Sequence, residues 1–96
     1  MGLFDFIGGM IQQANTDARE AQMEAERLDA RQICRELGRM SSTNLFKIAG
    51  YKTVLQSRCR NMNDRELKNI FNEMYCSKNI HACNAIKQII EERGLN

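Results

Sequence analysis

The sequence has no proline at all, and only six glycines and a single histidine among its 96 residues. Because proline and glycine are the residues that most strongly interrupt helices, their scarcity leaves little to break helical structure. Alanine, glutamate, arginine, glutamine, methionine and leucine, which are good helix formers, are plentiful instead. The composition therefore predicts an all-α fold.

The chain also lacks the groups on which most enzymes depend. Its one histidine is accompanied by neither a glycine-rich phosphate loop nor a G-x-S-x-G nucleophile motif. We therefore expect a protein that is not an enzyme and that needs no cofactor.

No stretch of the sequence approaches the roughly 18 consecutive apolar residues that a membrane-spanning helix requires. The first residues include Asp5 and no basic residue, so they make a poor secretory signal. We expect a cytoplasmic protein with little affinity for membranes, in which the four cysteines are reduced thiols.

What the sequence does contain is the balance of a small globular domain, with 43% hydrophobic and 27% charged residues. A chain of 96 residues has room for one domain. A domain of this size buries only about 60 to 65% of the surface that its unfolded chain exposes, so its stability margin is narrow. Association with a partner or with a second copy would add to that margin.

Apolar residues recur at alternating steps of three and four near the start of the chain, the heptad-like pattern of one helical face. They are Phe4, Ile7, Ile11, Ala14, Ala18, Ala21, Ala25 and Leu28. The pattern predicts a long N-terminal helix within residues 1–40, either continuous or broken near Gly8 and Gly9. The alanines bury little area, which suits packing against a bulkier helix. After Leu28 the apolar positions move to another face, so we expect the helix to change its contact surface there.

Residues 41–96 are expected to form a small three-helix bundle, which completes one compact domain. Gly38 and the polar run 41–44 predict a helix stop followed by a new start. Asn63, followed by a glutamate three residues later, predicts another start, and Gly50 predicts either a kink or a close helix contact. The expected helices run from Leu45 to about Arg60, from Asp64 to Tyr75 and from Ile80 to Arg93.

Four arginines follow one another at steps of four, an arginine ladder along the expected N-terminal helix: Arg27, Arg31, Arg35 and Arg39. Like charges at this spacing destabilise a helix by roughly 0.2 to 0.5 kcal/mol per pair, so some other group should offset them. In one interpretation Glu24, Glu36 and acids of other helices do so, which leaves a solvated face. In the other, the guanidinium groups bind an acidic surface, because they pair bidentately with carboxylate or phosphate.

These features favour a small non-catalytic protein-binding module, such as an adaptor, an inhibitor or a regulatory subunit. It would contact another protein, or a second copy of itself, through its helical surfaces. The residues expected to bind the partner are the N-terminal apolar residues and the arginine ladder: Phe4, Ile7, Ile11, Arg27, Arg31, Arg35 and Arg39.

Basic residues are concentrated in the middle of the chain. Residues 41–68 have six basic and two acidic residues, a net charge of +4, against +2 for the whole chain. Tyr51 shares a helical face with Lys47 and Arg58, and an aromatic ring among basic groups is compatible with phosphate contacts and base stacking. The alternative function is therefore a nucleic-acid-associated protein. Its phosphate-backbone patch would comprise Lys47, Tyr51, Lys52, Arg58, Arg60, Arg65 and Lys68.

Cys76, His81 and Cys83 have a spacing that invites comparison with a zinc site, with Cys59 as a fourth ligand. His81 and Cys83 lie two residues apart on an expected helix, which points them about 200° from each other, so we expect no metal site. Cys83 shares its face with Ile86 and is expected to behave as a small buried hydrophobic residue. A disulfide between Cys76 and Cys83 is the remaining alternative, and it would require an oxidising compartment.

Overall fold

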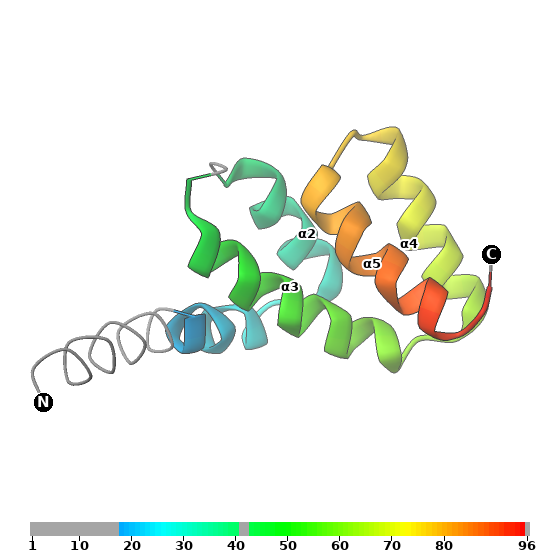
Figure 1. Ribbon diagram of the computed structural model, residues 1–96, viewed down its shortest axis with the longest axis horizontal. Coiled ribbons are helices and arrows are strands. Elements are labelled where there is room, and N and C mark those ends of the chain that lie inside the picture. The colour runs from blue at the N-terminus through cyan, green and yellow to red at the C-terminus, as the bar shows by residue number, and fades with distance from the viewer. Residues whose placement is uncertain (1–17, 41–42, 96) are drawn as a thin grey trace, which may run out of the picture.

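The computed structural model describes residues 18–40 and 43–95, and within these ranges the chain is helical and contains no strand (Figure 1). The expectation of an all-α fold is confirmed. Residues 18–26 are helical. The four helices that follow are α2 (Ala30–Arg39), α3 (Leu45–Arg60), α4 (Asp64–Cys76) and α5 (Ile80–Glu92).

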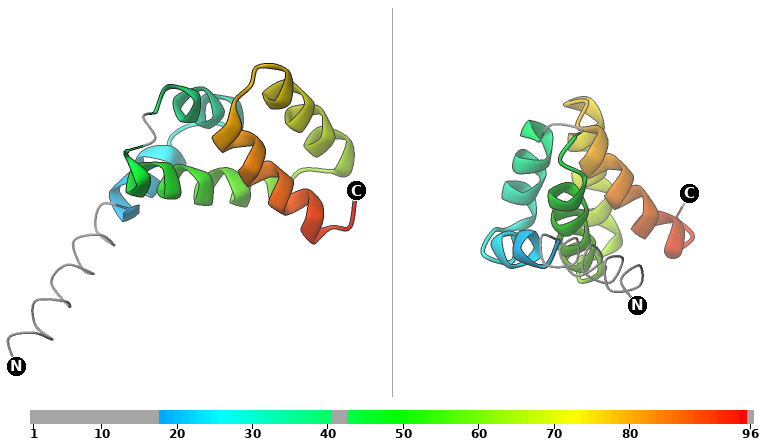
Figure 2. Two further views of the ribbon diagram at one scale, coloured as in Figure 1. Left: turned by 45° about the horizontal axis from the view of Figure 1, so that its top comes forward. Right: turned by 60° about the vertical axis from the view of Figure 1, so that its left-hand side comes forward.

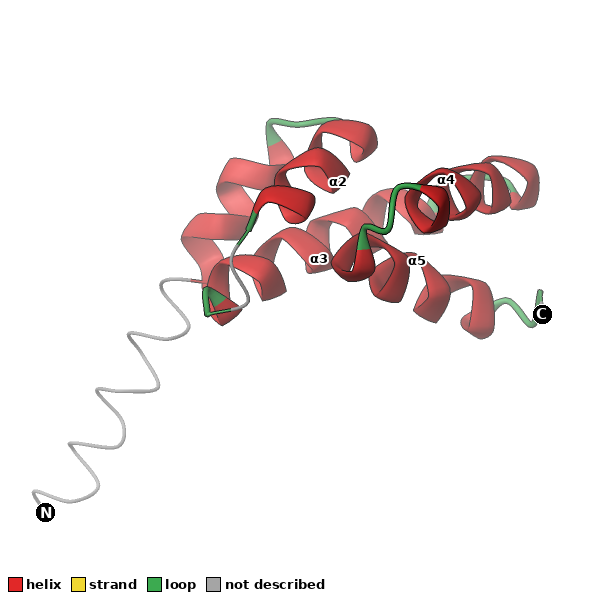
Figure 3. Cartoon of the chain, turned by 90° about the horizontal axis from the view of Figure 1, so that it is seen from above, coloured by secondary structure: helices red, strands yellow, loops and turns green. Residues whose placement is uncertain are grey.

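Helix α3 is the longest of the four helices α2 to α5. It packs against both α2 and α5, and α5 in turn packs against α2 and α4 (Figure 2). Helix α4 packs mainly against α5, so it has fewer neighbours than the other helices. Helices α4 and α5 lie at the end of the molecule away from the helical residues 18–26 (Figure 3).

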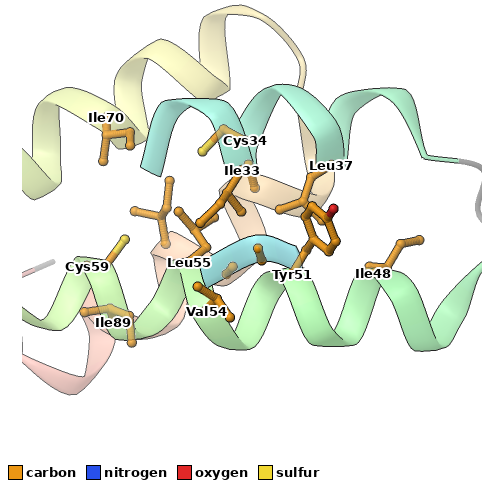
Figure 4. Close-up of a cluster of buried hydrophobic side chains, with 14 of the residues drawn as sticks. Ile33, Cys34, Leu37, Ile48, Tyr51, Val54, Leu55, Cys59, Ile70 and Ile89 are labelled. Carbon is orange, nitrogen blue, oxygen red and sulfur yellow. The ribbon is translucent and has the colours of Figure 1, made fainter. Parts of the chain in front are cut away.

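The buried side chains form one hydrophobic cluster to which every described helix contributes. Helix α2 supplies Ile33, Cys34 and Leu37, all fully buried, and they face Leu55 and other residues of α3 (Figure 4). The core is therefore larger than the three-helix bundle expected for residues 41–96. Helix α2 is part of the core, since Ile33, Cys34 and Leu37 are buried in the same cluster as residues of α3, α4 and α5.

The long N-terminal helix expected through residue 40 is interrupted at residues 27–29. Asp29 begins α2 with a capping box: its carboxylate accepts from the Gln32 backbone N–H at 2.8 Å, and the Gln32 side chain accepts from the Asp29 N–H at 2.9 Å. The change of contact surface expected after Leu28 is thus a break between two helices. The rest of that prediction, including Gly8 and Gly9, lies outside the described residues.

Residues 18–26 pack closely on α3 because Gly50 has no side chain. A Cβ at Gly50 would lie 2.6 Å from both the Ala18 carbonyl oxygen and the Ala21 Cβ. Ala21 and Ala25 are buried by this contact. Of the two roles expected for Gly50, the close helix contact is confirmed. Ala21 therefore meets a glycine of α3 at this crossing, and packing of the alanine stripe against a bulkier helix stays a prediction.

The start of α5 is joined to α2 by Asn79. Its side-chain oxygen accepts from the Ala82 N–H at 3.3 Å, which caps α5, and its amide donates to the Cys34 carbonyl oxygen at 2.7 Å. Gly38 lies inside α2, where a Cβ would approach the Asn79 amide nitrogen to 3.2 Å. Gly38 therefore permits this close approach and is not itself the residue that ends the helix. The expected stop and new start are confirmed, since α2 ends at Arg39 and α3 begins at Leu45.

Candidate functional site

The four arginines of the expected ladder do not lie on one helix. Arg27 precedes the capping box and lies in the turn between residues 18–26 and α2, whereas Arg31, Arg35 and Arg39 follow one another along α2. All four are exposed. The helix break at 27–29 therefore separates the first arginine from the other three.

Two of these arginines are paired with acids of the same chain. The Arg31 guanidinium donates to both carboxylate oxygens of Glu73 on α4, at 3.0 and 3.2 Å, and Arg39 lies 3.8 Å from Glu36. The hydrogen bond from Arg31 lowers the pKa of the Glu73 carboxyl. Within the described chain Arg35 makes no ion pair. This arrangement favours the first interpretation of the ladder, in which acids of the same chain offset the repulsion.

The aromatic residue of the expected nucleic-acid patch is buried. Tyr51 is only 5% exposed, its ring is directed from α3 toward Leu37, and its hydroxyl donates to the Glu24 carboxylate at 3.1 Å (Figure 4). Burial, followed by the Glu24 carboxylate, raises the pKa of Tyr51. Lys47 places its ammonium 5.9 Å from the centre of the same ring. The expectation that Tyr51 stacks on a nucleic-acid base is therefore wrong for this fold.

Arg58 and Arg60 of that patch are used within the chain. Arg58 donates to the Glu26 carbonyl oxygen at 2.9 Å, at the end of the helical residues 18–26, and Arg60 pairs with Glu92 of α5 at 3.3 Å. A guanidinium at a helix C-terminus stabilises carbonyl groups that have no partner in the helix. The helical residues 18–26 therefore cover the face of α3 that Tyr51 shares with Arg58.

The other members of the patch point in different directions. Lys52 lies on α3, five residues from Lys47 and hence about 140° around the helix. Arg65 and Lys68 are exposed on α4. These three residues are thus divided between α3 and α4.

The apolar half of the predicted partner surface cannot be placed. Phe4, Ile7 and Ile11 lie outside the described residues.

In the part of the chain that is described, no helix is long and apolar enough to cross a membrane.

The cysteines and the histidine do not converge on a common point. All four cysteines are free thiols, with Cys34 and Cys59 buried and Cys76 exposed. Among the described residues no group of three or more histidine, cysteine or acidic side chains is placed to hold a metal ion. Burial raises the pKa of the Cys34 thiol to about 12 and that of Cys59 to about 11, so both are neutral and unreactive near pH 7.

An open groove between α4 and α5, which sequence analysis did not identify, has an apolar floor. Its volume is about 280 Å³. The floor is formed by Phe71, Ile90 and Leu95, and the rim includes Lys68 and Lys87; Asn72 completes the lining. We refer to these six residues as the α4–α5 groove. In the sequence, only the apolar spacing of α4 indicated any part of this groove. That spacing marks Phe71 as a packing residue but does not show that Phe71 lies at the edge of the core.

Tyr75 extends the apolar surface of the groove along α4. Its ring stacks on that of Phe71 with 6.2 Å between ring centres, and 71% of the residue is exposed. Phe71 is itself only partly buried. Two aromatic rings therefore border solvent on one helix, over a floor of aliphatic side chains.

The size and lining of the α4–α5 groove limit what it can bind. Pockets that enclose small molecules usually hold about 300 to 1,000 Å³ and converge several polar groups on the ligand. This groove is open to solvent, and its polar groups are two lysines and one asparagine. Its shape suits the side chains of a docked protein segment.

No protein-family model, curated protein or solved structure gives a significant match to this chain. Its function must therefore be inferred from its own residues.

Proposed function

We propose that the protein is a small non-catalytic protein-binding module that holds its partner in the α4–α5 groove. The observation that supports this function is the uncovered aromatic pair of α4. Phe71 is half-buried and Tyr75 is 71% exposed, although the adjoining core is tightly closed. Aromatic residues at the edge of an apolar pocket are typical centres of binding energy in protein interfaces.

The module would act as an adaptor, an inhibitor or a regulatory subunit, by occupying a surface of its partner. The exposed arginines of the chain have a secondary role in this proposal. Arg27 and Arg35 make no ion pair in the described part of the chain, so they are free to attract an acidic partner. Exposed charges of this kind mainly affect the rate of association.

The alternative function in nucleic-acid binding has weaker support. It depended on Tyr51 as a stacking residue, and that ring is buried against the chain's own helices. Phosphate contacts alone would need a continuous row of free basic groups. Arg58 and Arg60 are engaged with other parts of the chain.

The test is a pull-down from lysate of the native cells with the tagged full-length chain, with and without nuclease. The wild type is compared with Tyr75→Asp, which places a charge on the exposed ring position, and with Asn69→Asp, which adds the same charge to an exposed position of α4 outside the groove. We expect one stoichiometric protein partner, retained by Asn69→Asp and lost by Tyr75→Asp, whatever the nuclease treatment.

Two results would contradict the proposal. One is a partner that Tyr75→Asp retains in the same amount as the wild type. The other is enrichment of nucleic acid with a broad, nuclease-sensitive set of proteins. Circular dichroism of each variant verifies that helix content is unchanged, which the high exposure of Tyr75 leads us to expect.

A further inference from the structure

The residues of the α4–α5 groove have the spacing of a surface that receives a helix. Lys68, Phe71 and Asn72 of the groove and the adjoining Tyr75 stand at positions i, i+3, i+4 and i+7 of α4, so they lie along one face over two helical turns, about 10 Å. Lys87 and Ile90 face them from α5. A docked amphipathic helix presents its anchors with the same i, i+3 or i+4, i+7 spacing.

The charge of the groove has one sign. Lys68 and Lys87 are exposed, and neither makes an ion pair with any described residue. No acidic residue lines the groove within the ranges that the structure describes. An occupant with apolar anchors flanked by carboxylates would therefore complement both the floor and the rim.

We propose that the α4–α5 groove binds an acidic amphipathic helix of another protein, its apolar side chains against Phe71, Ile90 and Leu95 and its carboxylates beside Lys68 and Lys87. This inference rests on the proposed function and specifies the chemistry of the partner. A segment that binds by adding a β-strand is a poorer fit, because it would need an open strand edge to pair with, and the described chain has no strand.

The probe is a displayed library of 16-residue peptides with randomised positions, selected on the full-length chain. We expect the enriched peptides to combine apolar residues at i, i+3 or i+4, and i+7 with an excess of aspartate and glutamate. Their affinity should fall by about tenfold when Lys68→Glu and Lys87→Glu are introduced together, since each change replaces an attraction by a repulsion.

A matched control changes the net charge by the same amount elsewhere. Arg19→Glu with Lys52→Glu, on the helical residues 18–26 and on α3, leaves the groove intact and should reduce affinity less than threefold. A swap experiment completes the design. Replacing the acidic residues of the best peptide by lysine should abolish binding to the wild type and restore it to the Lys68→Glu, Lys87→Glu protein.

Several outcomes would overturn the inference. They are enriched peptides that are basic or uncharged, peptides that bind the Tyr75→Asp protein equally well, and no enrichment at all. A molecular mass in light scattering that corresponds to a dimer and falls to the monomer in Tyr75→Asp would show that a second copy occupies the groove.

The two proposals fail separately. Suppose that a cellular partner binds in a Tyr75-dependent way but presents a basic segment. This result would support the protein-binding function and refute the proposal that the groove binds an acidic helix. A library that returns acidic helices, with no cellular partner dependent on Tyr75, would refute the proposed function.

Discussion

Replacing Gly50 with alanine should destabilise the protein, although alanine is the better helix former. Helix propensity alone favours alanine by about 1 kcal/mol. The new Cβ would lie 2.6 Å from the Ala18 carbonyl oxygen and from the Ala21 Cβ. Neither a backbone oxygen nor an alanine Cβ can rotate out of the way. The helical residues 18–26 would have to move away from α3 together.

The magnitude follows from the opposing effects. Overpacking a close contact costs about 1 to 3 kcal/mol, and rigid neighbours place Gly50 in the upper half of that range. Subtracting the gain in propensity of about 1 kcal/mol leaves a net loss of about 1 to 2 kcal/mol in the free energy of unfolding. For a chain of 96 residues this corresponds to a decrease in Tm of roughly 5 to 15 °C.

Thermal and urea unfolding followed by circular dichroism measure the effect, and Ala49→Gly is the matched control. Ala49 is exposed one residue earlier in α3, so this change should cost about 1 kcal/mol through propensity alone. Both variants should therefore be less stable than the wild type. A Gly50→Ala protein more stable than the wild type would refute the close packing of residues 18–26 on α3.

Two further substitutions test the start of α5 and the core. Asn79→Asp keeps the oxygen that caps α5 but removes the amide that donates to the Cys34 carbonyl oxygen, so urea unfolding should show a loss of about 1 to 3 kcal/mol. Asn63→Asp, at the exposed cap of α4, should cost about 0.5 kcal/mol or less, and equal losses would contradict this account. Stability should also fall by about 1.4 kcal/mol between pH 8 and 10 because of Cys34, whose thiol ionises near pH 9 in the unfolded chain but has a pKa of about 12 in the fold. Cys34→Ala should remove the part of this pH-dependent loss of stability that is due to Cys34. An unchanged pH dependence in this variant would contradict the assignment to Cys34.

The three helices after residue 44 could be predicted closely because their signals are local. Asn63 accepts from the Glu66 N–H at 2.8 Å, as its position in the sequence indicated, and α4 begins at the next residue. The apolar spacing of α4 and α5 likewise matches their buried residues, such as Ile70 and Ile86. Caps and periodicity depend only on neighbours in the chain, so the sequence is sufficient to locate them.

The break at residues 27–29 was missed for a physical reason. Ala25, before it, and Ile33, after it, are buried in the same core, so the apolar spacing continues across the interruption. Periodicity reports which side of a segment is buried and not whether the segment is one helix. The local signal was present, since Asp29 followed by Gln32 has the form of a capping box.

The candidate site could not be located from the sequence, because it depends on which faces are covered. Tyr51 and its basic neighbours share a helical face, and the Tyr51 ring is buried because residues 18–26 and α2 pack against α3. Phe71 has the spacing of a core residue. Phe71 nevertheless lies at the edge of the core, because α4 packs mainly on α5 and leaves one side of the Phe71 ring uncovered.

The basic residues of the chain have different roles, and the geometry of their side chains explains the division. Arg58 donates to a carbonyl oxygen at the end of residues 18–26, and Arg93 donates to two carbonyl oxygens at the end of α3. A planar guanidinium can satisfy several such acceptors at once, whereas an ammonium is a compact, strongly hydrated charge. Lys68 and Lys87 accordingly stay in solvent beside the groove. Counting basic residues therefore overstates the charge available to a partner, because the arginines at helix ends are already hydrogen-bonded to the chain itself.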